Sequence, residues 1–167
     1  LAWHYGDPLA EQRQLAAGVG TVDLSNRGVL RLSGIDRSDY LNALTTQRVD
    51  DLKPGHSSLT LNLNPQGFVL DELHVVADDY AIWISCEPES EAGLLEYLTK
   101  MRFRAKVEIE DISDQWAVVW QPRSVLHNQY RTWVSPFKSW QARELFVPRG
   151  EVDGIVAAAP AGMWAYE

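Results

Sequence analysis

The fold is decided by one stretch of the chain, residues 59–76, which reads LTLNLNPQGFVLDELHVV. Its first part alternates leucine with polar residues, as a strand with one buried face does. The tetrapeptide at residues 64–67 has the residue types of a tight turn, and an extended apolar run follows it. The stretch therefore predicts a β-hairpin.

Working outward from this hairpin, the patterns predict both helices and strands. N-cap residues followed by apolar positions mark helices, and period-two alternation marks strands. In chain order we expect a helix from Asp7 to Gly18, a strand over residues 21–32 that bends near Asn26, a short helix after Asp36, the hairpin, a strand over 80–85, a helix from Pro88, strands over 106–109 and 116–120, an irregular loop over 121–141, and a strand over 142–147. Meandering strands with helices between them favour an α+β fold over a doubly wound parallel sheet.

Composition narrows the class of protein. The chain has 167 residues, of which 46% are hydrophobic and 23% charged, as in ordinary globular proteins. Its formal net charge of -8 argues against nonspecific nucleic-acid binding. The single cysteine, Cys86, excludes an intrachain disulfide, and the four histidines have no ligand spacing, so we expect no metal site. No apolar run is long enough to cross a bilayer, and we expect a cytoplasmic protein.

The adjacent acids Asp71 and Glu72 are the best candidate functional residues. Strict alternation places them on opposite faces of the strand, each among apolar neighbours, and Glu72 shares its face with His74. A desolvated carboxylate can serve as a general acid or base, or can bind an N–H-rich heterocycle. In the alternative interpretation, one acid faces water and the other pairs with an arginine.

A second candidate is a basic run in which Lys100, Arg102, Arg104 and Lys106 alternate with less polar residues. If the segment is extended, four cations project from one face and could hold an anionic ligand tail. The alternative is a solvated edge whose cations pair with the acids at residues 108–111.

Three runs together resemble the aminomethyltransferase (glycine cleavage T-protein, GcvT-like) superfamily. They are VDLSNRG at residues 22–28, the helix with Tyr40 and Leu41 followed by two threonines at 45–46, and NPQGFVLDEL at residues 64–73. The combination most resembles the YgfZ-type folate-binding branch, which is implicated in iron–sulfur cluster assembly and repair.

The resemblance implies a folate-binding fold of intertwined β/α lobes, with mainly antiparallel sheets around a central channel. We expect two interleaved lobes, at about residues 1–85 and 86–167. Glu72 matches the catalytic aspartate of the T-protein, one methylene longer, and Leu59 stands where that pocket has a tyrosine. The resemblance thus predicts tetrahydrofolate as the ligand, contacts from Arg27, Leu59, Asp71, Glu72, Trp83 and Ser85, and Asp71 and Glu72 as the catalytic pair.

The chain also departs from the YgfZ-type pattern, because the lysine-glycine-cysteine motif of that branch is missing. Residues 162–167 resemble the family segment that shortly precedes this motif, so we expect a fragment that lacks the C-terminal part. Three functions stay open: a YgfZ-type folate-binding protein with iron–sulfur client proteins as partners, a folate-dependent aminomethyltransferase, and a non-catalytic scaffold with the same fold.

Overall fold

The computed structural model describes residues 1–122, 129–136 and 142–163, and it divides the chain into two compact units. Unit 1 comprises Leu1–Asn26 and Gln115–Glu167, and unit 2 comprises Arg27–Asp114. The chain is therefore interleaved, because unit 2 lies within the sequence of unit 1. The boundary expected near residue 85 falls inside unit 2, whereas the units separate after residues 26 and 114.

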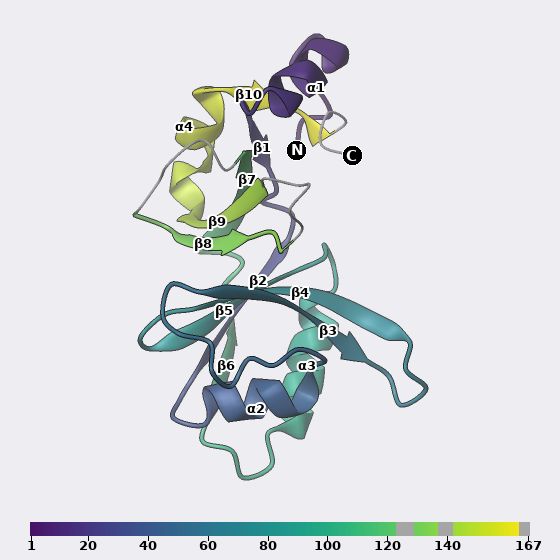
Figure 1. Cartoon of the computed structure of the whole chain (residues 1–167), viewed down its shortest axis with the longest axis vertical. Coiled ribbons are helices and arrows are strands. Elements are labelled where there is room, and N and C mark those ends of the chain that lie inside the picture. Colours follow the sequence, from purple (N-terminus) through teal and green to yellow (C-terminus); the bar gives the residue numbers. More distant parts are fainter. Residues whose placement is uncertain (123–128, 137–141, 164–167) are drawn as a thin grey trace. The chain divides into compact units, whose positions relative to one another are not determined.

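Unit 2 is a five-stranded antiparallel sheet with two helices. In chain order it contains β2 (Gly28–Ser33), α2 (Arg37–Leu44), β3 (Ser57–Leu63), β4 (Val69–Ala77), β5 (Ala81–Cys86), α3 (Glu91–Met101) and β6 (Glu108–Asp111). The strand order is β3-β4-β5-β2-β6, and every neighbouring pair is antiparallel. Helices α2 and α3 lie on the same face of this sheet (Figure 1).

The core of unit 2 lies between the sheet and these two helices. Alternate residues of β2, β4 and β5 point into it, and α2 and α3 contribute leucines and a tyrosine. The buried members include Leu30, Leu32, Leu73, Val75, Ile82, Ile84, Tyr40, Leu41, Leu94 and Leu98. We call this the helix-covered face of the sheet.

The predicted hairpin is confirmed as β3 and β4. The Asn64 side chain accepts hydrogen bonds from the backbone N–H groups of Gln66 and Phe68, at 3.0 and 2.9 Å. Gly67 has φ +85°, a left-handed conformation that glycine adopts without a steric cost. The turn chemistry of residues 64–67 therefore sets the register of the hairpin.

Unit 1 contains α1 (Pro8–Ala16), β1 (Thr21–Asp23), β7 (Trp116–Pro122), β8 (Arg131–Val134), β9 (Ala142–Pro148), the 3₁₀ helix η1 (Arg149–Glu151), α4 (Val152–Ala157) and β10 (Pro160–Ala161). Its sheet has the order β10-β1-β7-β9-β8, with one parallel pair, β1 and β10. The expected N-cap of the first helix is confirmed, because Asp7 accepts from the N–H groups of Leu9 and Ala10. With both sheets mostly antiparallel, the α+β class is confirmed.

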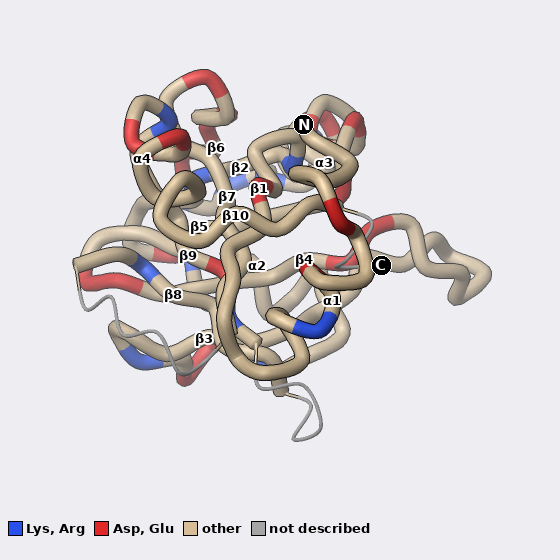
Figure 2. The backbone as a smooth tube through the Cα atoms, turned by 90° about the horizontal axis from the view of Figure 1, so that it is seen from above, with Lys and Arg blue, Asp and Glu red and all other residues tan. Residues whose placement is uncertain are grey.

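Two expectations about extended segments are wrong. Residues 21–32 form two strands in different sheets, β1 and β2, because the chain passes from one unit to the other at residues 26–27. The basic run is not a strand: Lys100 belongs to α3 and pairs with Glu96, and Phe103 has φ +41° in the turn that follows. Its four cations therefore do not lie along one strand. Figure 2 marks the Lys and Arg positions of the described chain in blue along the backbone.

The expected irregular loop over residues 121–141 also needs correction, because it contains β8. This strand pairs with β9, with Thr132 opposite Leu145. A strand of four residues gives too few alternations to be recognised by period. The helix expected near the C-terminal end falls largely outside the described residues. Among those described, no helix has both the length and the apolar character needed to span a membrane.

Candidate functional site

The two candidate acids lie on opposite faces of β4. Asp71 alternates with Leu73 and Val75, so it is on the helix-covered face, where Asn62 donates its side-chain N–H to Asp71 Oδ2 at 2.8 Å. Glu72 points to the other face, which we call the polar face, and 48% of its side chain is exposed. The two carboxylates therefore lie in different environments, Asp71 on the helix-covered face and Glu72 on the polar face.

Glu72 has a partner on its own strand. Its Oε1 lies 3.2 Å from Nε2 of His74, two residues along β4 on the same face. The His74 side chain is 8% exposed. A buried imidazole thus orients an accessible carboxylate on the same face of the strand.

The second half of the polar face is built around Arg27, which immediately precedes β2 and is 7% exposed. Its Nε donates to Ser85 Oγ at 2.9 Å, and its Nη1 lies 3.0 Å from Glu87 Oε1. Its Nη2 is buried and has no hydrogen-bond partner. One strong donor of this guanidinium is therefore unused, which is costly for a buried group.

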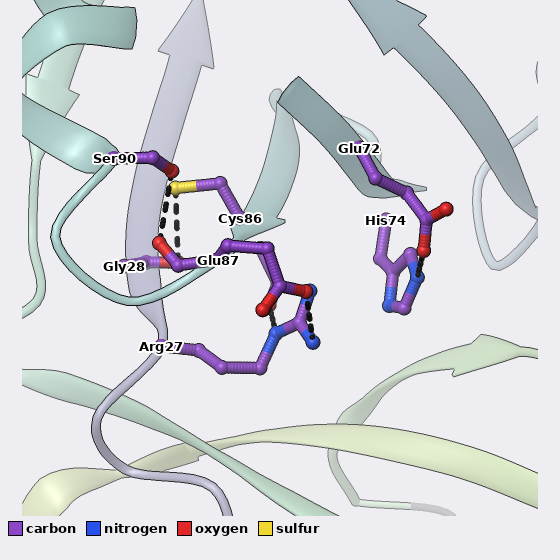
Figure 3. A network of polar contacts seen from close by, with 8 residues as sticks. Arg27, Gly28, Glu72, His74, Cys86, Glu87 and Ser90 are labelled. Atoms are coloured by element: carbon purple, nitrogen blue, oxygen red, sulfur yellow. Dashed lines mark hydrogen bonds and ion pairs between the residues drawn. The ribbon is translucent and has the colours of Figure 1, made fainter. Parts of the chain in front are cut away.

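The register of the sheet brings these residues together. Ser85 lies opposite His74 on β4 and opposite Val29 on β2. The same antiparallel register, continued by two residues, aligns Glu87 with Arg27 on one side and with Glu72 on the other. Figure 3 shows the resulting group, with the carboxylates of Glu72 and Glu87 and the guanidinium of Arg27 on neighbouring strands.

The apolar candidates belong to the same face. Leu59 is the register partner of His74, and Trp83 lies two residues before Ser85 on β5. Trp83 is 3% exposed, and its indole N–H donates to Asp78 Oδ2 at 2.9 Å. The indole donor is thereby satisfied, which leaves the ring as an apolar surface.

The polar face thus includes five of the six predicted contact residues: Arg27, Leu59, Glu72, Trp83 and Ser85. Asp71 is the exception, because alternation turns it toward the helix-covered face. Two polar residues of the group, His74 and Glu87, were not predicted as site residues. His74 could have been found from the sequence, because it stands two residues from Glu72 on the same strand. Glu87 follows the end of β5, and its position beside Arg27 becomes clear only from the register of the sheet.

Cys86 belongs to the helix-covered side of the sheet, away from the polar face. It is fully buried, and its sulfur lies 3.7 Å from the carbonyl oxygen of Gly28. Burial raises the pKa of this thiol to about 11, so the reactive thiolate does not form near neutral pH. Across the parts of the chain that the structure describes, no three His, Cys, Asp or Glu residues are grouped to hold a metal ion.

The residues of the polar face can bind a ligand that carries both hydrogen-bond donors and hydrogen-bond acceptors. Carboxylates accept hydrogen bonds from N–H groups, and the free Nη2 of Arg27 donates to an oxygen or nitrogen acceptor. Both functions occur on one face of one sheet, beside the apolar surfaces of Leu59 and Trp83.

Several known proteins are similar to this chain. A chloroplastic protein of Arabidopsis thaliana, named as a transferase, is 36% identical over 99 residues, which cover 59% of this chain and 23% of that protein. An aminomethyltransferase of Xanthomonas axonopodis pv. citri is 30% identical over 115 residues, or 66% of this chain and 31% of the relative. The matched region thus spans less than a third of either relative.

Solved structures show the same fold. The glycine cleavage system aminomethyltransferase T from Bartonella henselae superposes with a TM-score of 0.74 at 15% identity, covering 89% of this chain and 47% of that one. A chain of the heterotetrameric sarcosine oxidase from Corynebacterium sp. U-96 matches with a TM-score of 0.52 at 13% identity, covering 96% of this chain and 92% of that one.

The family assignment follows from the sequence itself. The model of the GCVT N-terminal domain matches residues 3–124, which is most of the chain and includes all of unit 2. The resemblance to the GcvT-like superfamily is therefore confirmed, and the chain belongs to the GCVT N-terminal domain family.

Proposed function

We propose that this chain is the tetrahydrofolate-binding part of a YgfZ-type protein, which assists iron–sulfur cluster assembly or repair. The observation that carries the proposal is the pairing of unlike groups on the polar face. Glu72 offers an accessible carboxylate, and Arg27 offers a buried donor without a partner. The partners of the whole protein would be folate and iron–sulfur client proteins, and the single cysteine favours the reducing cytoplasm.

The chemistry of a reduced pterin suits this pairing. One edge of the ring carries several N–H donors, and the ring also bears a carbonyl oxygen and lone-pair nitrogens. We assign the N–H edge to the Glu72 carboxylate and an acceptor atom to Nη2 of Arg27. Leu59 and Trp83 would supply apolar surface for the ring, and Ser85 would hold the guanidinium in place.

The two acids take different parts in this proposal. Glu72 is the group that contacts the ligand and, if the protein is an enzyme, the one that handles its proton. Asp71 supports the hairpin from the other face through Asn62, which is 2% exposed. Its role in this proposal is structural and confined to the hairpin.

Calorimetric titration with tetrahydrofolate tests the proposal. We expect Glu72→Gln to weaken binding roughly 10- to 100-fold, because hydrogen bonds to a charged group are worth about 1.5–3 kcal/mol. Asp71→Asn is the matched control: it makes the same acid-to-amide change one residue away, on the opposite face, and should leave affinity nearly unchanged.

Two outcomes would overturn the assignment. Equal affinity of wild type and Glu72→Gln would remove Glu72 from the site. Failure of the folded wild-type chain to bind tetrahydrofolate would favour the non-catalytic scaffold instead.

A second function, one-carbon transfer to tetrahydrofolate, is favoured by the aminomethyltransferases among the relatives. It predicts that the protein converts tetrahydrofolate to its methylene form when an aminomethyl donor is supplied, and that Glu72→Gln abolishes this turnover. Folate binding without turnover would favour the YgfZ-type function.

A further inference from the structure

A row of buried polar side chains crosses three neighbouring strands of unit 1. Thr21 on β1, Gln121 on β7 and Arg143 on β9 are 3%, 2% and 6% exposed. Gln121 is the register partner of Arg143, and it donates its side-chain N–H to Thr21 Oγ1 at 3.0 Å. Residues opposite each other in antiparallel strands share a face, so the three side chains form one group.

The hydrogen-bonding capacity of this group is only partly used. Nε and Nη2 of Arg143 are buried without a partner, and so is Oε1 of Gln121. No Asp or Glu among the described residues forms an ion pair with Arg143. Burial lowers the pKa of this guanidinium, as expected for a cation without a nearby counter-charge.

The identity of the open atoms defines the ligand that would fit. Nε and Nη2 lie on the same edge of a guanidinium, where their two N–H bonds run parallel and match the two oxygens of a carboxylate. The open oxygen of Gln121 is an acceptor and requires an N–H or O–H donor. Side chains directly opposite across a strand pair start about 5 Å apart, so this donor must be only a few bonds from the carboxylate.

We propose that Arg143 and Gln121 form a binding site for a small carboxylate that carries an adjacent N–H or O–H group, such as an α-amido or α-hydroxy acid. The guanidinium binds the carboxylate through its Nε–Nη2 edge, and Gln121 Oε1 accepts the neighbouring hydrogen. Thr21 fixes the Gln121 amide so that its oxygen is available. The site lies within unit 1 and does not depend on the folate proposal, whose residues all belong to unit 2.

The simpler interpretation is that Gln121 rotates in solution and pairs with Arg143 directly. It would then satisfy both residues without a ligand. The two interpretations differ in their response to added carboxylate, and they also differ in the effect of removing the guanidinium.

The test is an NMR titration that follows the Nε–Hε signal of Arg143, which Arg143→Lys identifies by its disappearance. N-acetylglycine, glycolate, acetate and phosphate are added separately at constant ionic strength, because screening alone shifts exposed signals. We expect saturable shifts with N-acetylglycine and glycolate, at an affinity roughly 5- to 10-fold above that of acetate, since one further hydrogen bond is worth about 1 kcal/mol.

Two variants separate the parts of the site. Gln121→Leu should reduce the affinity for N-acetylglycine to that for acetate, because only the carboxylate contact remains. Arg143→Lys should abolish saturable shifts of backbone amides in β7 and β9, although it retains the charge. Arg13→Gln, which removes an exposed arginine of the same unit, is the control and should change neither result.

Thermal unfolding supplies an independent readout. Replacing an unpaired buried charge by an apolar side chain of similar volume is often stabilising. Arg143→Met should therefore raise the Tm of the ligand-free protein and remove the further rise that N-acetylglycine gives to the wild type. Absence of saturable shifts in the wild type, a lower Tm of Arg143→Met, or saturation by phosphate alone would each overturn the proposal.

Discussion

The two faces of the unit 2 sheet are made by the same strands, yet they differ in almost every physical respect. On β4, Leu73 and Val75 are fully buried against the helices, whereas Glu72 and His74, which alternate with them, belong to the polar face. The helix-covered face is mainly apolar, with Asp71 and Asn62 as a hydrogen-bonded polar pair, and the polar face combines apolar surfaces with charges, among which Arg27 has a buried donor without a partner. Because side chains alternate along a strand, residues of the core and residues of the candidate site follow one another on β4.

The largest effect should come from truncating a buried side chain on the helix-covered face. Leu73 is 0% exposed, so Leu73→Ala should lower the free energy of unfolding by about 2–5 kcal/mol, through lost burial and the cavity left behind. Urea denaturation measures it. Val69→Ala, at a position of the same strand that is 56% exposed, is the control and should cost about 0.5 kcal/mol or less. Equal losses at both positions would contradict the assignment of the core to this face.

Alkaline pH should weaken the same face by way of Tyr40. Burial raises the pKa of this phenol to about 12, and its hydroxyl donates to the carbonyl oxygen of Leu98. The unfolded tyrosine releases its proton near pH 10, before the folded one does, so stability falls as pH rises from about 10 to about 12. The loss should be on the order of 2 kcal/mol, seen in denaturation midpoints across this range.

Tyr40→Phe is the control for that measurement. This variant should be less stable at neutral pH. It should also lack the part of the stability loss between about pH 10 and about pH 12 that comes from ionisation of Tyr40. The raised pKa of Cys86 gives both proteins a common decline beginning near pH 9, so only the difference between them is informative. Identical pH profiles would show that Tyr40 ionises equally in both states.

A smaller effect is expected on the polar face. Ser85→Ala removes the acceptor for Nε of Arg27, and a second buried donor of that guanidinium is then unsatisfied. The free energy of unfolding should fall by about 1–3 kcal/mol, near the lower end because the Glu87 pair remains. The double variant Arg27→Met with Ser85→Ala should recover part of this loss. Absence of recovery would show that the hydroxyl matters for packing alone.

The smallest effect should come from the surface. Lys100 pairs with Glu96 one helical turn earlier on α3, and both side chains are more than half exposed. Lys100→Ala should leave the denaturation midpoint unchanged within error, because solvent screens exposed pairs. A measurable loss would show that polar contacts outside the polar face also support this unit.

The sequence predicted those parts of the molecule that depend on local patterns. Residues 59–76 combine alternation with turn chemistry, so the hairpin and the opposite orientations of Asp71 and Glu72 could be predicted. The division of residues 21–32 between two sheets could not, since each half pairs with strands far away in the sequence. The basic run at 100–106 has the period of a strand, but a left-handed residue at Phe103 ends the helix there.

The site was predictable to the extent that it follows from alternation and from the family resemblance. Alternation correctly placed Glu72 on a face with His74. The catalytic role that the resemblance gives Glu72 stays a prediction. The contact between Arg27 and Ser85 joins residues 58 positions apart, and no local pattern encodes it. That Nη2 of Arg27 has no hydrogen-bond partner can be known only from the folded structure, in which all its neighbours are positioned.

The interleaved order of the two units has a consequence for how the protein folds during synthesis. Unit 2 is continuous from residue 27 to residue 114, so all its strand pairs can form as soon as this segment has left the ribosome. Strand β1 is made first, but the strands that pair with it in the described part of the chain are β7 and β10, so Asp23 must wait for Val119. Loop closure over a chain that has already folded into a compact body costs less entropy than closure over a disordered one. Early folding of unit 2 would therefore accelerate the completion of unit 1.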